Sequence, residues 1–238
     1  MSTLVLTAHG SRDARSGANA RAVAERLTRM RPGLDVRLAF LELNAPSLID
    51  VLAGLPDSRR AVLTPLLLAS AYHARHDIPK QIAAAGADGI RQADVLGEDD
   101  RLVSVLRERL TAVGVSALDD ELGVVVVAIG SSNTAANART ARVATLLASG
   151  TQWAGAAMAF ATLPDQSVAD AASRLRRRGA KRLVIAPWFL APGRITDGVC
   201  DYARDNGIPM AAPLGAHRLV AATVLDRYDQ ALAEHAAA

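Results

Sequence analysis

An internal duplication constrains the possible folds of this sequence more than any other feature. The tripeptide His-Gly-Ser at positions 9–11 recurs as Ile-Gly-Ser at 129–131, which is 120 positions later. Two single landmarks keep nearly the same spacing: Phe40 with Phe160, and Pro65 with Pro187. Landmarks that recur in the same order indicate two homologous halves, and a period this long indicates a duplicated domain, not a solenoid.

Each half alternates short apolar runs with segments in which apolar residues recur at helical spacing. The runs of strand length cover 4–8, 36–41, 61–68, 90–95, 124–129, 155–161, 182–190 and 208–212. The helical segments include 16–31, 45–55, 77–85, 99–113, 165–178, 196–206 and 217–236. This alternation predicts an α/β fold with parallel sheets that are covered by helices on both faces. We expect one domain over residues 1–117 and a second over 118–238, joined near Ser116–Glu121.

Composition excludes several classes of protein. Half of the residues are hydrophobic, which excludes a mainly disordered chain, and Cys200 is the only cysteine, which excludes a disulfide scaffold. No apolar run approaches the roughly 18 residues that a membrane span requires. The start of the chain lacks the basic segment of a signal peptide, so we expect a cytoplasmic protein without a membrane partner.

The charge pattern argues for a small ligand. The formal net charge is +3, and the basic residues are dispersed along the chain. Aromatic residues make up 3% of the sequence, too few to stack a series of bases, so we expect no nucleic-acid partner. A mildly basic protein favours an anionic ligand.

Candidate functional residues follow the predicted strands of the first half. His9 follows the first strand, Glu42 the second, and Tyr72-His73 the third. Ligands of parallel α/β sheets bind beyond the carboxyl ends of the strands, so we expect His9, Glu42 and His73 to share one cleft. Two imidazoles and a carboxylate suit transient binding of a divalent metal of borderline softness. They also suit proton abstraction near neutral pH.

The second half serves as an internal control for these three residues. At its equivalent positions stand Ile129, Thr162 and Ile195. The polar groups are therefore absent, although the strand and turn landmarks remain. A residue needed for folding tends to persist in both copies, whereas one needed for chemistry can be lost from one. We infer that the first half carries the reactive groups and that the second half forms the other wall of the cleft.

The remaining histidines and the cysteine fit less specific interpretations. His76 lies one helical turn after His73 and is interpreted as a surface or supporting residue. His217 and His235 fall in or before the last helical segment and are interpreted as structural. Cys200 has no CxxC partner, which favours a buried thiol.

The loop at Gly10-Ser11 has the composition of a tight turn that opens a helix. The free N–H groups of such a turn can hold an anion. The loop is not a dinucleotide fingerprint, because G-x-G-x-x-G is missing. The sequence also contains no Walker motif, no G-x-S-x-G elbow and no H-E-x-x-H.

Three segments of the first half, LVLTAHGSRD, FLELNAPSL and PLLLASAYHARHDIP, resemble the sirohydrochlorin chelatase family, the class II tetrapyrrole metal chelatases. The resemblance is strongest over residues 4–110. In the second half, VAIGSSN and PWFLAPGRITDG resemble the degenerate copy of the long two-domain members. The resemblance implies two homologous flavodoxin-like, chelatase-type domains related by internal duplication.

The resemblance also implies an activity and roles for residues. Family members insert Fe2+ or Co2+, sometimes Ni2+, into a modified tetrapyrrole such as sirohydrochlorin, without ATP. The metal is a substrate, so we expect no permanently bound cofactor. The two metal-facing histidines of the family fall on His9 and His73, and its acidic residue falls on Glu42. Because Ile195 replaces the second histidine in the second half, we expect no metal there.

The expected chemistry assigns further residues to the substrate. A neutral imidazole can accept a pyrrole proton and present the metal, while an acidic group carries protons away. Bidentate arginines suit the carboxylates of the tetrapyrrole, and Arg12, Arg75 and Arg194 lie beside predicted strand ends. We assign substrate binding to Gly10, Ser11, Arg12, Tyr72 and Arg194. We expect the cleft between the halves to be the pocket, and a monomer, because a duplication can replace a dimer.

Two alternatives stay open at this point. A strand that ends in His-Gly also begins histidine phosphatases, but there the histidine follows an arginine, and here it follows Ala8. Such an enzyme also needs a second histidine late in the chain, for which His217 is the candidate. The other alternative is a carrier that binds the tetrapyrrole or the metal without catalysis, which composition does not exclude.

Overall fold

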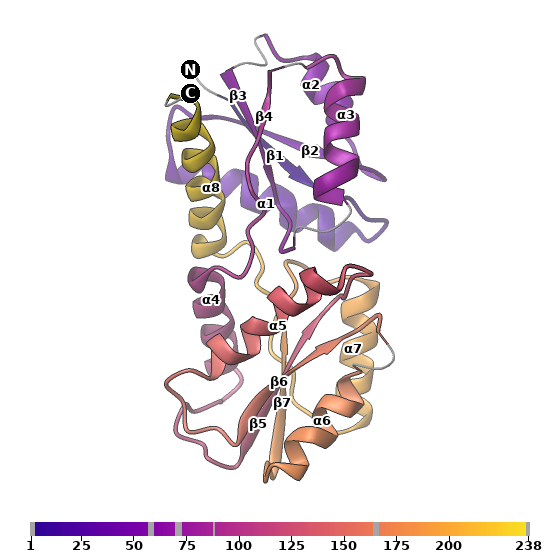
Figure 1. The fold of residues 1–238 in the computed structure, drawn as a ribbon, viewed down its shortest axis with the longest axis vertical. Coiled ribbons are helices and arrows are strands. Elements are labelled where there is room, and N and C mark those ends of the chain that lie inside the picture. Colours follow the sequence, from indigo (N-terminus) through magenta and orange to yellow (C-terminus); the bar gives the residue numbers. More distant parts are fainter. Residues whose placement is uncertain (1–2, 57–59, 70–72, 88, 164–166, 237–238) are drawn as a thin grey trace. The chain divides into compact units, whose positions relative to one another are not determined.

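The computed structural model describes residues 3–56, 60–69, 73–87, 89–163 and 167–236, and it contains two parallel β-sheets with helices on both faces (Figure 1). The first sheet has the order β2-β1-β3-β4 and consists of β1 (Thr3–Ala8), β2 (Asp35–Phe40), β3 (Ala61–Pro65) and β4 (Arg91–Gln92). The second has the order β6-β5-β7 and consists of β5 (Leu122–Ala128), β6 (Gly155–Phe160) and β7 (Arg182–Pro187). The predicted fold class is confirmed.

The helices alternate with the strands along the chain. The first series is α1 (Ala14–Met30), α2 (Leu48–Ala53), the π-helix η2 (His73–Asp77), α3 (Ile78–Ala84) and α4 (Asp100–Thr111). The second series is α5 (Thr134–Ala148), α6 (Val168–Arg177), α7 (Arg194–Asp205) and α8 (Arg218–Ala236). Among the described helices, none is long and apolar enough to cross a membrane.

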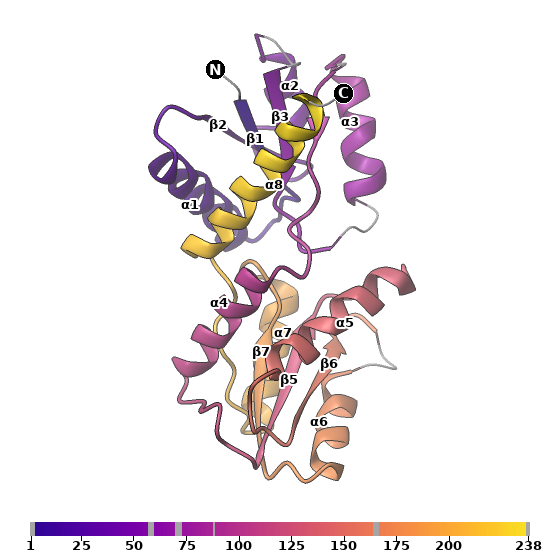
Figure 2. The same ribbon diagram turned by 60° about the vertical axis from the view of Figure 1, so that its left-hand side comes forward.

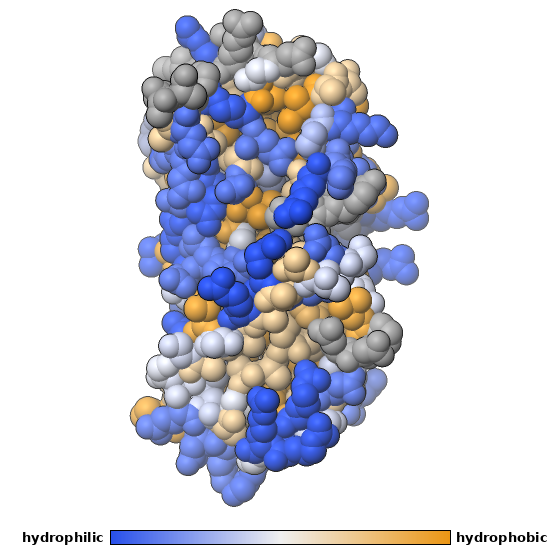
Figure 3. Space-filling view, in the orientation of Figure 1, coloured by the Kyte–Doolittle hydropathy of each residue, from blue (hydrophilic) through white to orange (hydrophobic). Residues whose placement is uncertain are grey.

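The central strands are buried along their whole length because helices cover both faces of each sheet. Every residue of β1 and of β5 is buried. In the first unit, α2 and α3 share a hydrophobic cluster with one face of the sheet. In the second unit, α6 and α7 do the same. The charged residues therefore lie at the surface. Figure 3 shows hydrophilic side chains spread over one face of the molecule.

The compact units of the structure do not coincide with the halves of the sequence. One unit consists of residues 1–97 together with 216–238, and the other of residues 98–215. In the first unit α8 packs against α1 and β3, and in the second α4 packs against α5 and β7 (Figures 1 and 2). Each repeat therefore gives its last helix to the other unit. The boundary predicted between residues 117 and 118 marks the sequence repeat, not the division in space.

Several predicted elements differ locally from the structure, among them the strand expected over 90–95, which covers only Arg91–Gln92, and the strand expected over 182–190, which ends at Pro187. The helix expected from residue 45 begins at Leu48, because the Ser47 side chain accepts a hydrogen bond from the Asp50 N–H and so caps the helix there. The strand expected over 61–68 ends at Pro65. The strand expected over 208–212 is reduced to a bridge between Ile185 and Met210, because the prolines at 209 and 213 have no N–H to donate.

Candidate functional site

The carboxyl edge of the first sheet brings His9 and Glu42 together. Beyond the end of β2, the Leu41 N–H donates to Ala8 O at 2.9 Å and the Glu42 N–H donates to His9 O at 3.0 Å. The two side chains therefore start from adjacent points, and His9 Nδ1 lies 3.4 Å from Glu42 Oε1. The side chains are 35% and 53% exposed, which leaves the pair accessible to a ligand.

Gly10 permits the close approach of the loops that follow β1 and β2. Its φ is +98°, and a Cβ at this position would lie 1.8 Å from the Glu42 carbonyl oxygen. Only a residue without a side chain fits there, because an oxygen of the backbone cannot move aside without disrupting the turn. The glycine of the His-Gly-Ser motif therefore brings the loop after β1 against the loop after β2.

The loop after β2 makes a strained turn directly after Glu42. The Asn44 N–H donates to Glu42 O at 2.7 Å, which closes a γ-turn with Leu43 at its centre. Leu43 has a φ of +63° and is the one non-glycine residue with positive φ in the described part of the chain. Asn44 also accepts, through Oδ1, a hydrogen bond of 2.7 Å from the Ser11 N–H.

The loop after β1 runs directly into α1. The Asp13 side chain accepts a hydrogen bond from the Arg15 N–H at 3.0 Å and so caps the helix. The Arg15 guanidinium also donates to the Asp13 carboxylate, and this lowers the pKa of Asp13 to about 2. Ser11 Oγ accepts a hydrogen bond from the Asp13 N–H at 3.0 Å, which ties the motif to the helix start.

His73 begins η2, and its side chain lies outside the described part of the structure, as does the whole of Tyr72. The strand that precedes η2 is β3, which pairs with β1 so that Pro65 lies opposite Thr7. His9 and the segment that contains His73 therefore both follow strands that end at the same edge of the sheet. That all three predicted side chains share one cleft stays a prediction.

The other predicted residues are surface groups of their own units. Arg12 is exposed in the loop before α1, and Arg75 and His76 are exposed on η2. Arg194 is the exposed first residue of α7, which belongs to the second unit. Among the described residues, no group of three histidine, cysteine, aspartate or glutamate side chains is placed to hold a metal ion. Within the part of the chain that the structure describes, the side chains at this site that could bind a metal ion are therefore His9 and Glu42.

The structure also tests the interpretations of His217 and Cys200. His217 Nδ1 accepts a hydrogen bond of 3.3 Å from the Leu219 N–H at the start of α8, in agreement with the structural role predicted for it. The predicted buried thiol is wrong, because Cys200 is only half-buried on α7. Its sulfur lies 3.5 Å from the sulfur of Met210.

The second sheet repeats this edge with different side chains. The Ala161 N–H donates to Ala128 O at 2.8 Å and the Thr162 N–H donates to Ile129 O at 3.0 Å, as in the first sheet. Thr162 Oγ1 bonds back to the Ile129 carbonyl at 2.6 Å, and the Ile129 side chain is 49% exposed. The backbone of the site is therefore present twice, whereas the imidazole and the carboxylate are present once.

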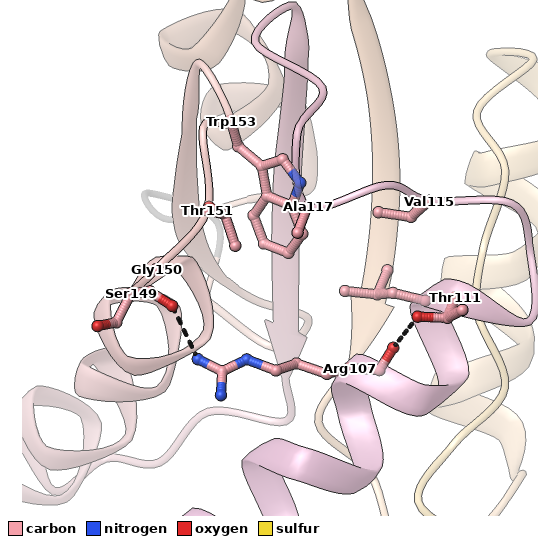
Figure 4. Close-up of a pocket in the computed structure, with 9 residues that line it drawn as sticks. Arg107, Thr111, Val115, Ala117, Ser149, Gly150, Thr151 and Trp153 are labelled. Atoms are coloured by element: carbon pink, nitrogen blue, oxygen red, sulfur yellow. Dashed lines mark hydrogen bonds between the residues drawn. The ribbon is translucent and has the colours of Figure 1, made fainter.

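A cavity of about 340 Å³ lies at the opposite, amino-terminal edge of the second sheet (Figure 4). Arg107 reaches across it from α4 and donates to the carbonyls of Leu146 and Ser149 at the end of α5, at 2.6 and 3.1 Å. The Trp153 indole N–H donates to Ser116 O at 2.8 Å. The bonds from Arg107 satisfy carbonyl groups at the end of α5 and attach α4 to it. The cavity is therefore part of the packing between these helices.

The fold and the site define a duplicated parallel α/β protein that carries an imidazole and a carboxylate at the edge of one of its two sheets. The chain belongs to the CbiX family, whose model matches residues 3–113 and again residues 123–231. The two matches confirm the predicted duplication and the predicted resemblance.

Named relatives are similar to the chain over different lengths. The sirohydrochlorin ferrochelatase of Priestia megaterium is 29% identical over 203 residues, which cover 81% of this chain and 74% of that protein. The sirohydrochlorin cobaltochelatase of Sulfurisphaera tokodaii is 32% identical over 80 residues, 33% of this chain and 67% of that protein. The solved structure of SirB from Bacillus subtilis with Fe3+ has the same fold, with a TM-score of 0.81 at 23% identity over 97% of this chain and 96% of that one.

Proposed function

We propose that this chain is an ATP-independent chelatase that inserts Fe2+ or Co2+ into sirohydrochlorin or a closely related tetrapyrrole. Membership of the CbiX family supports the reaction class, and the relatives named above are a ferrochelatase and a cobaltochelatase. The observation that carries the proposal is the His9–Glu42 pair, with 3.4 Å between Nδ1 and Oε1, which the second sheet lacks at the same backbone positions.

The hydrogen bonds around His9 suggest how its imidazole works. Nδ1 lies 3.0 Å from the Gly10 carbonyl oxygen, which can only accept a hydrogen bond. Nδ1 therefore carries the proton in the neutral ring, and Nε2 carries the lone pair. A lone pair on Nε2 can bind the incoming metal ion, and the carboxylate beside Nδ1 orients the ring.

Metal insertion also requires two pyrrole protons to leave. Glu42 is half exposed and in contact with His9, so it can pass a proton from the imidazole to water. His73 is proposed as the second imidazole, on the ground of the family resemblance and its position after β3. Few protein ligands and open coordination positions suit this reaction, because a closed tetrahedral site would retain the metal.

Carboxylates of the substrate require cationic or N–H partners. We assign Arg12 and Arg194 to them as exposed guanidinium groups, together with Gly10, Ser11 and Tyr72. The Ser11 N–H already donates to Asn44, so its contribution falls to the hydroxyl group. The proposal further includes Ni2+ as a third metal, no resident cofactor, a monomer and a cytoplasmic location.

The test is spectrophotometric metal insertion into sirohydrochlorin, with Fe2+, Co2+ and Ni2+ in parallel. We expect metallation faster than the uncatalysed rate with iron or cobalt, a rate at or near the blank for His9→Ala, and a normal rate for the matched control Ile129→Ala. Tight binding of the tetrapyrrole with metallation at the blank rate would instead identify a carrier. Hydrolysis of phosphoesters without metallation would identify a phosphatase.

A further inference from the structure

We propose that Asn44 is a positioning residue that holds His9 and Glu42 in register for metal transfer. This inference rests on the chelatase function proposed above. Asn44 is two residues beyond Glu42, and its side chain bonds to the residue two beyond His9. It therefore ties the loop that carries the imidazole to the loop that carries the carboxylate.

Two hydrogen bonds from one residue make this tie. Asn44 Oδ1 accepts from the Ser11 N–H at 2.7 Å, and the Asn44 N–H donates to Glu42 O at 2.7 Å. The side chain is half-buried, and Gly10 packs closely beside it, since a Cβ at Gly10 would lie 3.4 Å from Asn44 Oδ1. The tie spans 33 positions of sequence, and it joins the loops after β1 and β2 beyond their last backbone bond, from the Glu42 N–H to His9 O.

The second unit satisfies the equivalent N–H group in a different way. There the Ser131 N–H donates to Oδ1 of Asn137, six positions later, at 2.9 Å. Asn137 returns a bond from Nδ2 to Ser131 O at 2.7 Å. A serine N–H in this turn therefore needs a partner for folding, but a local asparagine is sufficient. The partner from the neighbouring strand occurs where the imidazole and the carboxylate occur.

The hydrogen bond between Ser11 and Asn44 stabilises the strained turn at Leu43. A leucine at a φ of +63° has a disfavoured backbone conformation, which persists where surrounding contacts enforce it. The Ser11–Asn44 bond is such a contact, because it anchors the far end of the turn through a side chain. Without it, the turn can relax and move Glu42 away from His9. A displacement of about 1 Å can cost roughly 100-fold in rate.

The test compares three variants in the intact chain. Asn44→Leu keeps the volume and removes the acceptor, and Asn44→Asp keeps the acceptor. Asn137→Leu removes the local tie of the second unit and is the matched control. We expect Asn44→Leu to lower kcat for Co2+ insertion at least tenfold with less than a twofold change in KM for the tetrapyrrole. We expect Asn44→Asp to restore most of that loss and Asn137→Leu to leave kcat unchanged.

Co2+ alone gives a second readout that does not depend on turnover. By titration calorimetry, Asn44→Leu should weaken Co2+ binding in the wild-type background and have no further effect in a His9→Ala background, because it acts through His9. Equal losses of kcat in Asn44→Leu and Asn137→Leu, or additive effects with His9→Ala, would overturn the inference.

If Asn44→Leu does not fold, Asn44→Ser, which is too short to reach Ser11, replaces it with the same expectations. A wild-type chain that fails to metallate sirohydrochlorin refutes the proposed function, whereas normal kcat in both the Leu and the Ser variant refutes only the role of Asn44.

Discussion

The edges of the two sheets have the same backbone and different side chains. In both units the hydrogen bonds to the central strand continue for two residues beyond the end of its neighbour, β2 or β6, with nearly identical lengths. Both loops then begin with a glycine at positive φ, Gly10 at +98° and Gly130 at +94°. The first edge carries His9 and Glu42, and the second carries Ile129 and Thr162. The comparison teaches that folding requires the ladder and the glycine, while the imidazole and the carboxylate are dispensable for it.

The largest expected contrast is between His73 and its counterpart Ile195. His73→Ala should abolish metal insertion, because the proposed mechanism loses an imidazole. It should change the free energy of unfolding by less than about 1 kcal/mol, since the second unit folds with isoleucine at this position. Ile195→Ala should leave the rate unchanged. The check is metallation rate beside thermal melting, and a large drop in melting temperature for His73→Ala would point to a structural histidine.

Glu42 and Thr162 should differ by a smaller factor. Glu42→Gln keeps the shape of the side chain but removes the proton acceptor, so kcat/KM for metal insertion should fall by about 100-fold. Thr162→Val removes only the hydroxyl that bonds to Ile129 O and should leave kcat/KM unchanged. Steady-state kinetics with Co2+ measure both. Equal activity of Glu42→Gln and wild type would contradict proton transfer through Glu42.

Substitution of the two glycines should reduce stability and activity to different extents. Alanine at either position adopts a disfavoured positive φ, which costs roughly 1–2 kcal/mol. Gly10→Ala also places its Cβ 1.8 Å from a backbone oxygen, whereas Gly130→Ala meets the Thr162 hydroxyl at 2.8 Å, which can rotate away. We expect the larger loss in urea-unfolding free energy for Gly10→Ala, together with lost metallation. Equal destabilisation of the two variants would show that the loop after β2 yields more easily than the structure indicates.

The smallest expected contrast is a difference in acid sensitivity between two helix starts. Asp13 caps α1 and Asn133 caps α5. The pKa of Asp13 is lowered from 3.8 to about 2 by the hydrogen bond from the Arg15 side chain. The cap therefore stabilises the folded chain above pH 3.8, and that contribution is lost as the pH falls toward 2.

Amide hydrogen exchange measures this difference directly. The Arg15 N–H should lose protection between pH 4 and 2, relative to the Ala136 N–H, which an uncharged asparagine caps. Asp13→Asn should remove the pH dependence at Arg15. Parallel loss of protection at the two helix starts would mean that global unfolding, not the cap, sets the response.

Much of the fold could be predicted from residue patterns, because the apolar runs and the repeat both report local structure. The repeat also identified His9 and Glu42, because aligning the two halves of the sequence shows that these residues at the strand ends are replaced in the second half. The exchange of α4 and α8 could not be predicted, because the apolar face of a helix does not specify which of two similar sheets it covers. Asn44 was missed for a related reason: an asparagine after a strand indicates a turn, and nothing local reveals an acceptor for a residue 33 positions earlier.

The exchanged helices have a consequence for how the protein is made on the ribosome. The second unit is one continuous stretch, so it can close as soon as residue 215 has emerged. The first unit lacks α8 until residues 218–236 have emerged, and until then a face of its sheet beside β3 stays uncovered. The sheet that carries His9 and Glu42 thus begins to form before the second unit and is covered on both faces only after the second unit has been synthesised.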